Sequence, residues 1–235
     1  SRGLVGSEMC IRDSLMQRGE AHNEAAAAEG REPMEPPVIL VIEKAAGIGD
    51  HQLSGAVINT AAFAELMPDF IEQGFPTEYV CDDSQFIAFT MKHTFKSPIC
   101  PPIFQKKGYH VASLSNVTKW LGEKCEEAGI EIYPGFAAAE ILTDGDRVIG
   151  VRTGDMGIDK SGDTKPTFQP GMDILAKVTV LGEGVRGTLT EKIIEKFGMQ
   201  GEHPQAFKTG IKEIWRVKPE NHKPGRVVHG SLFPD

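Results

Sequence analysis

The stretch Val38-Ile-Leu-Val-Ile-Glu43, followed by Lys44-Ala-Ala-Gly47-Ile-Gly49, decides the fold of this chain. Its unbroken apolar, β-branched run is typical of a buried strand in a parallel sheet. The run ends in a carboxylate, and α/β folds bind ligands at the carboxyl ends of their strands. In dinucleotide-binding folds an acid at that position accepts hydrogen bonds from a ribose diol. Glu43 is therefore a candidate nucleotide-binding residue, although no Gly-x-Gly-x-x-Gly turn precedes the strand.

Composition limits the classes of function that are open to the chain. Of 235 residues, 40% are hydrophobic, which is enough for a core, and 33 acidic residues against 25 Lys and Arg give a formal charge of −8. That charge argues against a nucleic-acid partner. The four cysteines lie far apart without a Cys-x-x-Cys pair, so they indicate no disulfide framework and no zinc or iron–sulfur site. No apolar run is long enough to predict a membrane-spanning helix.

Residues 1–37 differ from the rest of the chain. The first fourteen show no amphipathic period and resemble a translated sequencing adapter, and Leu15–Gly30 reads as the remnant of a helix. We interpret 1–37 as an unreliable or disordered N-terminus, a non-native leader plus that remnant, and exclude it from fold reasoning.

Apolar periodicity and turn residues predict the elements beyond residue 38. Helices are expected from Asn59 or Thr60 to about Ile71, at 188–197, and at 116–128 with Ser115 as N-cap. In the helix at 116–128 the residues expected to face inward are Val117, Trp120, Leu121 and Cys125. Strands are expected at 85–90 and 94–98 as a hairpin, and at 130–133. An antiparallel meander is expected at 139–142, 147–152 and 176–181, with Asp144-Gly145-Asp146 as a hairpin turn. A further strand is expected at 208–217, with 226–229 pairing back. Two prolines exclude a central strand at 99–104.

The helix near residue 60 carries an apolar face, and two explanations of this face stay open. Its members are Phe63, Leu66, Met67, Phe70 and Ile71. Burial of each would contribute about 1.5–3 kcal/mol, so something must cover the face. Periodicity favours ordinary core packing over contact with a membrane surface.

A second glycine turn, Gly182-Glu183-Gly184, follows the strand expected at 176–181 and precedes a helix. A strand, glycine turn and helix allow backbone N–H groups to approach an anionic ligand. The turn equally fits a tight connection without a ligand.

Several segments together resemble the electron-transfer flavoprotein:ubiquinone oxidoreductase family. They are Val41–Ala56, Gly129–Leu142, Gly154–Lys160, Ala176–Gly184, Gly210–Trp215 and Lys223–Val227. The similarity covers roughly 38–235. Ser54-Gly55 and the segment Tyr133–Ala139 are its specific parts, whereas a strand ending in an acid is shared by many flavoproteins.

The resemblance implies an α/β fold with α+β elements. This would be an incomplete FAD/NAD(P)-binding Rossmann-like domain of glutathione-reductase type, with an antiparallel meander and the start of a quinone-binding sheet. Residues 38–203 would be the partial FAD domain, with a membrane-associating segment at 54–74, and 204–235 would begin the ubiquinone-binding domain. Within this family assignment, membrane contact of Phe63, Leu66, Met67 and Phe70 is favoured over core packing.

The resemblance also implies an activity and a place in the cell. The enzyme would pass electrons from reduced electron-transfer flavoprotein to ubiquinone, using FAD and a 4Fe-4S cluster. It would lie peripherally on the matrix side of the mitochondrial inner membrane or the cytoplasmic side of a bacterial inner membrane.

Particular residues receive cofactor roles from the same resemblance. Glu43, with Lys44 beside it, would hold the adenosine ribose of FAD. Gly49, Ser54 and Gly55 would line the flavin side of the loop.

Further along the chain, the backbone of Ala138 would meet the adenine. Gly182, Glu183 and Gly184 would pass close to the cofactor. The flavin supplies the redox chemistry, so no catalytic side chain is assigned. No metal ligand is assigned either, because the family's cluster cysteines have no match in this sequence.

Departures from the family pattern predict an interior fragment. The first glycine turn, which places helix N–H groups on the pyrophosphate, is absent from the sequence. We therefore expect the isolated chain to fold poorly, bind FAD poorly and be inactive alone. The alternatives are another FAD-dependent oxidoreductase, such as a flavin monooxygenase or a geranylgeranyl-type reductase, and a non-enzymatic peripheral membrane-binding module.

Overall fold

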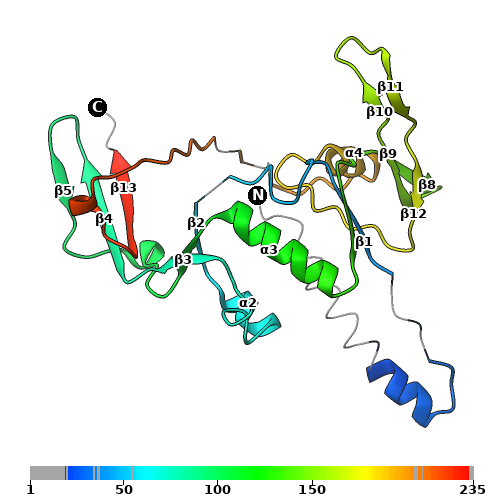
Figure 1. Ribbon diagram of the computed structural model, residues 1–235, viewed down its shortest axis with the longest axis horizontal. Helices are drawn as coiled ribbons and strands as arrows, with labels where there is room; N and C mark the ends of the chain where they lie inside the picture. The colour runs from blue at the N-terminus through cyan, green and yellow to red at the C-terminus, as the bar shows by residue number, and fades with distance from the viewer. Residues whose placement is uncertain are drawn as a thin grey trace. The chain divides into compact units, whose positions relative to one another are not determined.

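The computed structural model describes residue 19 and residues 21–33, 35, 38–53, 55–203, 206–207 and 209–232 (Figure 1). Chain contacts divide the molecule into two compact units, each built from two segments. The first unit comprises residues up to 52 together with 121–208, and the second comprises 53–120 together with 209–235. The expected mixed α/β class is confirmed. The domain boundaries expected from the sequence, 38–203 and 204–235, stay a prediction.

The first unit contains a pair of parallel strands, as the apolar stretch Val38–Glu43 predicts. β1 (Leu40–Glu43) pairs in parallel with β7 (Glu131–Pro134), and Glu43 lies opposite Pro134. Val41 is buried, whereas Val38 is 90% exposed. The parallel strand is confirmed, but its complete burial is wrong, because β7 is the only strand paired with β1 among the described residues.

Helix α3 (Leu114–Glu127) contains the boundary between the two units, which falls after Trp120. The four residues expected to face inward, Val117, Trp120, Leu121 and Cys125, are buried, and so are Thr118 and Gly122. The helix begins earlier than predicted, because Ser113 rather than Ser115 accepts a hydrogen bond from a backbone amide of the first turn.

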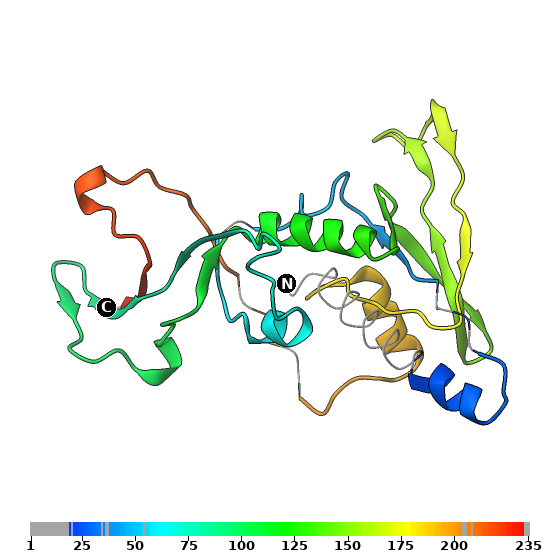
Figure 2. The ribbon, with the colours of Figure 1, turned by 60° about the horizontal axis from the view of Figure 1, so that its bottom comes forward.

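Three antiparallel strands follow in the first unit. They are β8 (Ala138–Asp144), β9 (Arg147–Thr153) and β12 (Asp173–Leu175), in the order β12-β9-β8. The meander is confirmed, but its third strand is wrong: residues 176–181 form no strand, and 173–175 pair with β9 instead. A separate hairpin of β10 (Met156–Ile158) and β11 (Thr164–Gln169) extends from this sheet (Figure 1 and Figure 2).

Helix α4 (Thr188–Lys196) lies beside β8. Leu189 is fully buried, and two lysines of the helix reach the strand. Lys192 Nζ donates to the carbonyl of Ala139 at 3.2 Å, and Lys196 Nζ donates to Thr143 Oγ1 at 2.6 Å. The helix expected at 188–197 is confirmed.

The second unit holds an antiparallel sheet in the order β2-β6-β3, formed by β2 (Ala56–Ile58), β3 (Thr77–Val80) and β6 (His110–Ala112). Helix α2 (Ala61–Leu66) is shorter than predicted, and Asn59 Oδ1 accepts the Ala61 amide at its start. The rings of Phe63, Phe70, Phe75, His110 and Trp120 form an aromatic cluster in this unit.

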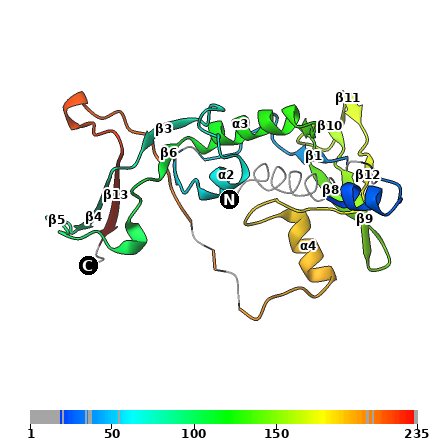
Figure 3. The same ribbon diagram turned by 90° about the horizontal axis from the view of Figure 1, so that it is seen from below.

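A second sheet of this unit has the order β13-β4-β5, from β4 (Asp83–Phe89), β5 (Thr94–Lys96) and β13 (Arg226–Leu232). The expected hairpin is confirmed in β4 and β5, and a 3₁₀ turn at Pro102–Phe104 agrees with the exclusion of a strand there. A further 3₁₀ turn covers Pro219–Asn221. The strand expected at 208–217 is wrong for the described residues 209–217, and β13 instead pairs in parallel with β4 (Figure 3).

Candidate functional site

Glu43 lies half-buried at the carboxyl end of β1. Its Oε1 accepts a hydrogen bond from the backbone amide of Ala45 at 2.7 Å, which fixes the carboxylate against the chain that follows the strand. The other carboxylate oxygen accepts no hydrogen bond within the part of the chain that the structure describes. An ionised carboxylate has about four lone-pair sites, so this oxygen can accept hydrogen bonds from a ligand hydroxyl.

The ends of β1 and β7 are joined beyond their last paired residues. The carbonyl of Ala45 accepts the amide of Gly135 at 2.7 Å, and Gly135 has a φ of +84° that only glycine adopts readily. Lys44, between the two anchored residues, is exposed. The structure therefore places Glu43 and the Pro134-Gly135 turn at one edge, as expected for the carboxyl ends of parallel strands.

The glycine loop, residues 47–52, follows this edge. Asp50 N donates to Gly47 O at 3.2 Å and Gln52 N donates to Gly49 O at 3.1 Å, while Gly49 is buried with a φ of +82°. Gln52 Oε1 is buried and has no hydrogen-bond partner among the described residues. A buried acceptor without a donor is unfavourable by about 1–3 kcal/mol, which marks the loop as a place where a ligand group could bind.

Ala138 is the first residue of β8 and is half-buried. It lies opposite Thr153 of β9, and the neighbouring Ala137 accepts the amide of Gly154 at 2.8 Å. These contacts hold the segment that leads from the Pro134-Gly135 turn into the meander. The structure thus connects Ala138 to the edge that carries Glu43 through a short stretch of chain.

Glu183 has a structural role that sequence reasoning missed. Its Oε1 accepts the amide of Leu189 at 3.2 Å, and its Oε2 accepts the amide of Thr190 at 2.7 Å and the Thr190 hydroxyl at 2.8 Å. The side chain therefore caps the N-terminus of α4. A Cβ at the N-cap residue Gly187 would lie 2.6 Å from Glu183 Oε2, so only glycine leaves room for this carboxylate.

The capping changes the interpretation of the Gly182-Glu183-Gly184 turn. The strand expected before it is absent from residues 176–181, and two amides of the first turn of α4 are already bound to an internal anion. The proposed approach of helix N–H groups to an anionic ligand is therefore wrong for Leu189 and Thr190. The lack of a capping side chain at Gly187 was the available signal, because helices usually have one from Ser, Thr, Asp or Asn.

The loop residues expected beside the flavin belong to different units. Ser54 lies outside the described residues. Gly55 belongs to the second unit, where its φ is +79° and its carbonyl accepts Lys212 Nζ at 2.7 Å. Gly49 belongs to the first unit with Glu43.

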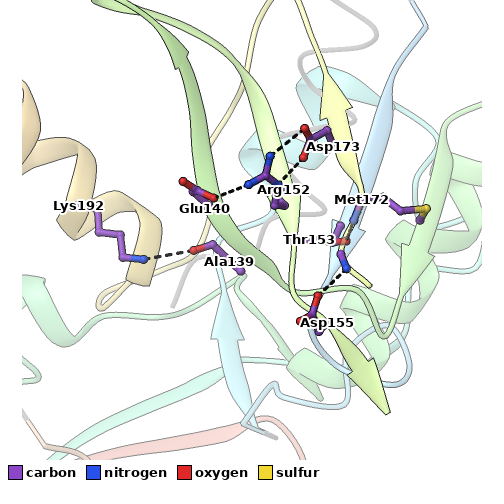
Figure 4. A network of polar contacts seen from close by, with 9 residues as sticks. Ala139, Glu140, Arg152, Thr153, Asp155, Met172, Asp173 and Lys192 are labelled. Atoms are coloured by element: carbon purple, nitrogen blue, oxygen red, sulfur yellow. Dashed lines mark hydrogen bonds and ion pairs between the residues drawn. The ribbon is translucent and has the colours of Figure 1, made fainter. Parts of the chain in front are cut away.

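A polar network on the meander was also missed by sequence reasoning (Figure 4). Arg152 lies between two acids: its Nη2 donates to Asp173 Oδ2 at 3.0 Å, and its Nη1 lies 3.1 Å from Glu140 Oε2. Its hydrogen bond lowers the pKa of Asp173 and raises that of Arg152, and burial opposes both shifts. The network joins all three strands of the sheet, so its evident role is structural.

The described residues contain neither a candidate metal site nor a candidate membrane-spanning helix. No group of three or more His, Cys, Asp or Glu side chains there could hold a metal ion. None of the described helices combines the length and the apolar character needed to span a bilayer.

A carboxylate at the carboxyl end of a parallel strand is the feature that this chain shares with dinucleotide-binding α/β proteins, in which such an acid binds the ribose. The comparisons specify this class further. A probable electron transfer flavoprotein-ubiquinone oxidoreductase of Acinetobacter baylyi is 42% identical over 201 residues, or 83% of this chain and 35% of that protein. The mitochondrial electron transfer flavoprotein-ubiquinone oxidoreductases of Arabidopsis thaliana and Homo sapiens are 43% and 40% identical over 83% of this chain and about a third of their own lengths.

The chain is thus homologous to a segment of electron transfer flavoprotein-ubiquinone oxidoreductases, and the resemblance found in the sequence is confirmed. It spans about a third of the length of the curated relatives it matches. No protein-family model matches it. A flavoprotein/dehydrogenase from Cytophaga hutchinsonii aligns with 83% of this chain and 44% of its own at 13% identity, but its TM-score of 0.44 is too low to define a shared fold.

Proposed function

We propose that this chain is the FAD-binding segment of a flavin-dependent oxidoreductase that passes electrons from reduced electron-transfer flavoprotein to ubiquinone. The supporting observation is the 40–43% identity to oxidoreductases of that name over 83% of the chain. A second supporting observation is Glu43 at the end of a parallel strand, because its half-buried carboxylate has one oxygen available to a ligand. FAD supplies the two-electron redox chemistry when bound, so the protein's task is to bind and orient it.

The residues present fit part of an FAD site. Glu43 would accept a ribose hydroxyl through its available oxygen while Ala45 holds the other. Gly49 and Gly135 would let the backbone come close to the cofactor, because neither has a side chain at its left-handed φ. Gln52 Oε1, buried without a donor, would accept a hydrogen bond from a ligand N–H or O–H.

The remaining assigned residues stay part of the proposal with narrower roles. Lys44, Ser54 and Gly55 would border the cofactor, and Ala138 would approach the adenine through its backbone. Gly182, Glu183 and Gly184 would pass the cofactor with their backbone only, because the carboxylate of Glu183 is engaged with α4.

The cellular setting follows the same homology. We place the protein on a membrane surface, as a peripheral protein on the matrix side of the mitochondrial inner membrane or the cytoplasmic side of a bacterial inner membrane. Electron-transfer flavoprotein and ubiquinone would be its partners, and a 4Fe-4S cluster its second redox group, with ligands outside this sequence.

The packing of Phe63 in α2 and of the residues that follow this helix weighs against the non-enzymatic membrane module. Phe70 is buried, and the rings of Phe63 and Phe75 lie 5.2 Å apart within the aromatic cluster. Trp120 also donates its Nε1–H to the carbonyl of Gln73 at 3.0 Å. These aromatic side chains pack inward, so a membrane contact would have to use exposed residues such as Ile71, which is 44% exposed.

A flavin titration tests the cofactor proposal. FAD added to the full chain should show weak but saturable quenching of its fluorescence. Glu43→Gln keeps an oxygen for the Ala45 amide but replaces the available acceptor with a donor. We expect the dissociation constant to rise by about 10- to 100-fold, since a hydrogen bond to a charged group contributes about 1.5–3 kcal/mol.

Glu126→Gln, an exposed site on α3, is the matched control for the loss of one charge. It should leave the titration unchanged. No saturable binding up to millimolar FAD, or equal affinities for the parent and Glu43→Gln, would overturn the proposed FAD site.

A further inference from the structure

Gly122 lies buried in the interior of α3, where glycine is a poor choice for a helix. Glycine in the middle of a helix is less favourable than alanine by about 0.5–1 kcal/mol, because it loses more backbone freedom on folding. Its neighbour Leu121 and the nearby Cys125 are buried apolar residues that suit a packed helix. The presence of glycine at this position is therefore explained best by a neighbour that leaves no room for a side chain.

That neighbour is Ile48 of the glycine loop. A Cβ at Gly122 would lie 2.8 Å from Ile48 Cδ1 and 3.1 Å from Ile48 Cγ2, whereas ordinary contact begins at 3.4 Å. The side chain of Ile48 thus rests directly on the backbone of α3. Both residues belong to the first unit, together with Glu43.

Neither Ile48 nor the loop can easily yield to an added methyl group. Cδ1 of Ile48 can turn about χ2, but Cγ2 is attached to Cβ and moves only with χ1, whose rotation is restricted in β-branched residues. The loop around it is already tight: a Cβ at Gly47 would lie 2.7 Å from Asp50 Oδ2, and Gly49 holds a φ of +82°. An extra methyl group on α3 would therefore push the loop backbone away from the helix.

We propose that Gly122 is a positioning residue that seats the glycine loop against α3. It sets how far Gly49 and the buried Gln52 Oε1 lie from the edge that carries Glu43. The effect on cofactor binding rests on the proposed function, whereas the effect on the loop does not. A displacement near 1 Å would stretch a hydrogen bond of about 2.9 Å from this loop to a ligand beyond the usual hydrogen-bond range.

Gly122→Ala in the full chain tests this proposal with two measurements. The first is amide hydrogen exchange at Asp50 and Gln52, whose N–H groups are bonded to Gly47 and Gly49 within the loop. We expect exchange at both to accelerate by about tenfold or more as the loop loosens. The second is the FAD titration, in which the dissociation constant should rise by about tenfold, the change expected for the loss of about one hydrogen bond.

A rescue experiment separates positioning from a general loss of stability. Ile48→Ala removes the atoms that an added methyl group would meet, so Gly122→Ala introduced in that background should no longer accelerate exchange or weaken FAD binding. It should instead raise the melting temperature, as expected for glycine replaced by alanine in a helix. Glu123→Ala, an exposed neighbour on α3, is the control and should change neither measurement.

The outcomes keep this proposal distinct from the proposed function. If Gly122→Ala alone raises the melting temperature and leaves exchange at Asp50 and Gln52 unchanged, the positioning role is wrong. If exchange accelerates and is rescued by Ile48→Ala but no variant binds FAD, the positioning role stands and the flavin assignment fails.

Discussion

Thr190 binds Glu183 twice: its backbone N–H and its hydroxyl both donate to Oε2, at 2.7 and 2.8 Å. Glu183→Ala removes this cap and also releases the Leu189 amide. We expect the free energy of unfolding to fall by about 1–2 kcal/mol, the usual range for a lost helix cap. Urea unfolding followed by circular dichroism measures it. Glu195→Ala, an exposed residue at the other end of α4, should have a much smaller effect; equal losses for the two variants would contradict the capping role.

The Arg152–Asp173 pair should make stability depend on acid. The hydrogen bond from Arg152 lowers the pKa of Asp173 in the folded chain, and partial burial opposes the shift. A lowered folded pKa means that the stabilisation is complete above the ordinary Asp value of about 4 and is lost as pH falls through the folded value. We expect the free energy of unfolding to decline less steeply below pH 4 in Asp173→Asn than in the parent, measured by urea unfolding at several pH values.

Asp146→Asn is the control for that experiment, because Asp146 is exposed in the β8–β9 turn and its side chain makes no hydrogen bond or ion pair in the described part of the chain. It should retain the acid dependence of the parent. A parent and an Asp173→Asn variant with the same slope below pH 4 would show that the ion pair contributes nothing measurable, as many exposed pairs do.

Gly150 should tolerate no side chain. Its φ is +152°, and a Cβ there would collide with the carbonyl oxygen of Ile174 across the β9–β12 pair. Gly150→Ala should therefore break the edge strand β12 and lower the melting temperature, with a loss of about 1–3 kcal/mol from backbone strain before the collision is added. Gly154→Ala is the matched control, because a Cβ there meets only ordinary contacts at 3.7 Å and beyond. A similar melting temperature for both variants would rule out the collision.

Phe75 should carry much of the stability of the second unit. Its ring centroid lies 5.2 Å from those of Phe63 and Phe70 and 5.5 Å from that of Trp120. Phe75→Ala should reduce the free energy of unfolding by about 3–5 kcal/mol, as for other buried aromatic residues. Phe95→Ala, at a site that is 65% exposed, should be close to neutral. Tryptophan fluorescence reports the change, and a neutral Phe75→Ala would show that the cluster is not a core.

The sequence pattern was sufficient to predict an element where the residues of that element show apolar periodicity or a turn motif. The run ending at Glu43 predicted a parallel strand, and the spacing of Val117, Leu121 and Cys125 predicted the buried face of α3. Both succeed because apolar periodicity reports which side of an element is covered. The turn at Asp144-Gly145-Asp146 likewise marked the β8–β9 hairpin, since glycine there adopts a φ of +59°.

Pattern failed where pairing depends on distant segments. Residues 209–217 have strand-forming side chains, yet Ile211 and Ile214 are each 87% exposed and no strand pairs with them in the described part of the chain. β-propensity reflects packing against neighbours, so it cannot say whether a neighbour exists. The ion pair of Arg152 with Asp173 joins residues 21 positions apart, and no local motif predicts it. The cap of α4 by Glu183 is local, and its one sequence signal is Gly187, which cannot cap the helix itself.

β4 pairs in parallel with β13, and Arg226 donates a hydrogen bond to Asp83, 143 positions earlier in the sequence. During synthesis β4 therefore leaves the ribosome long before its partner strand. At roughly 5–20 residues per second, a ribosome needs on the order of ten seconds to deliver the partner that β4 requires. Throughout that interval the β4 edge of the nascent β4–β5 hairpin stays open to solvent, with its hydrogen-bonding groups unpaired. We therefore expect β4 and β5 to be the segments that bind chaperones or aggregate during translation.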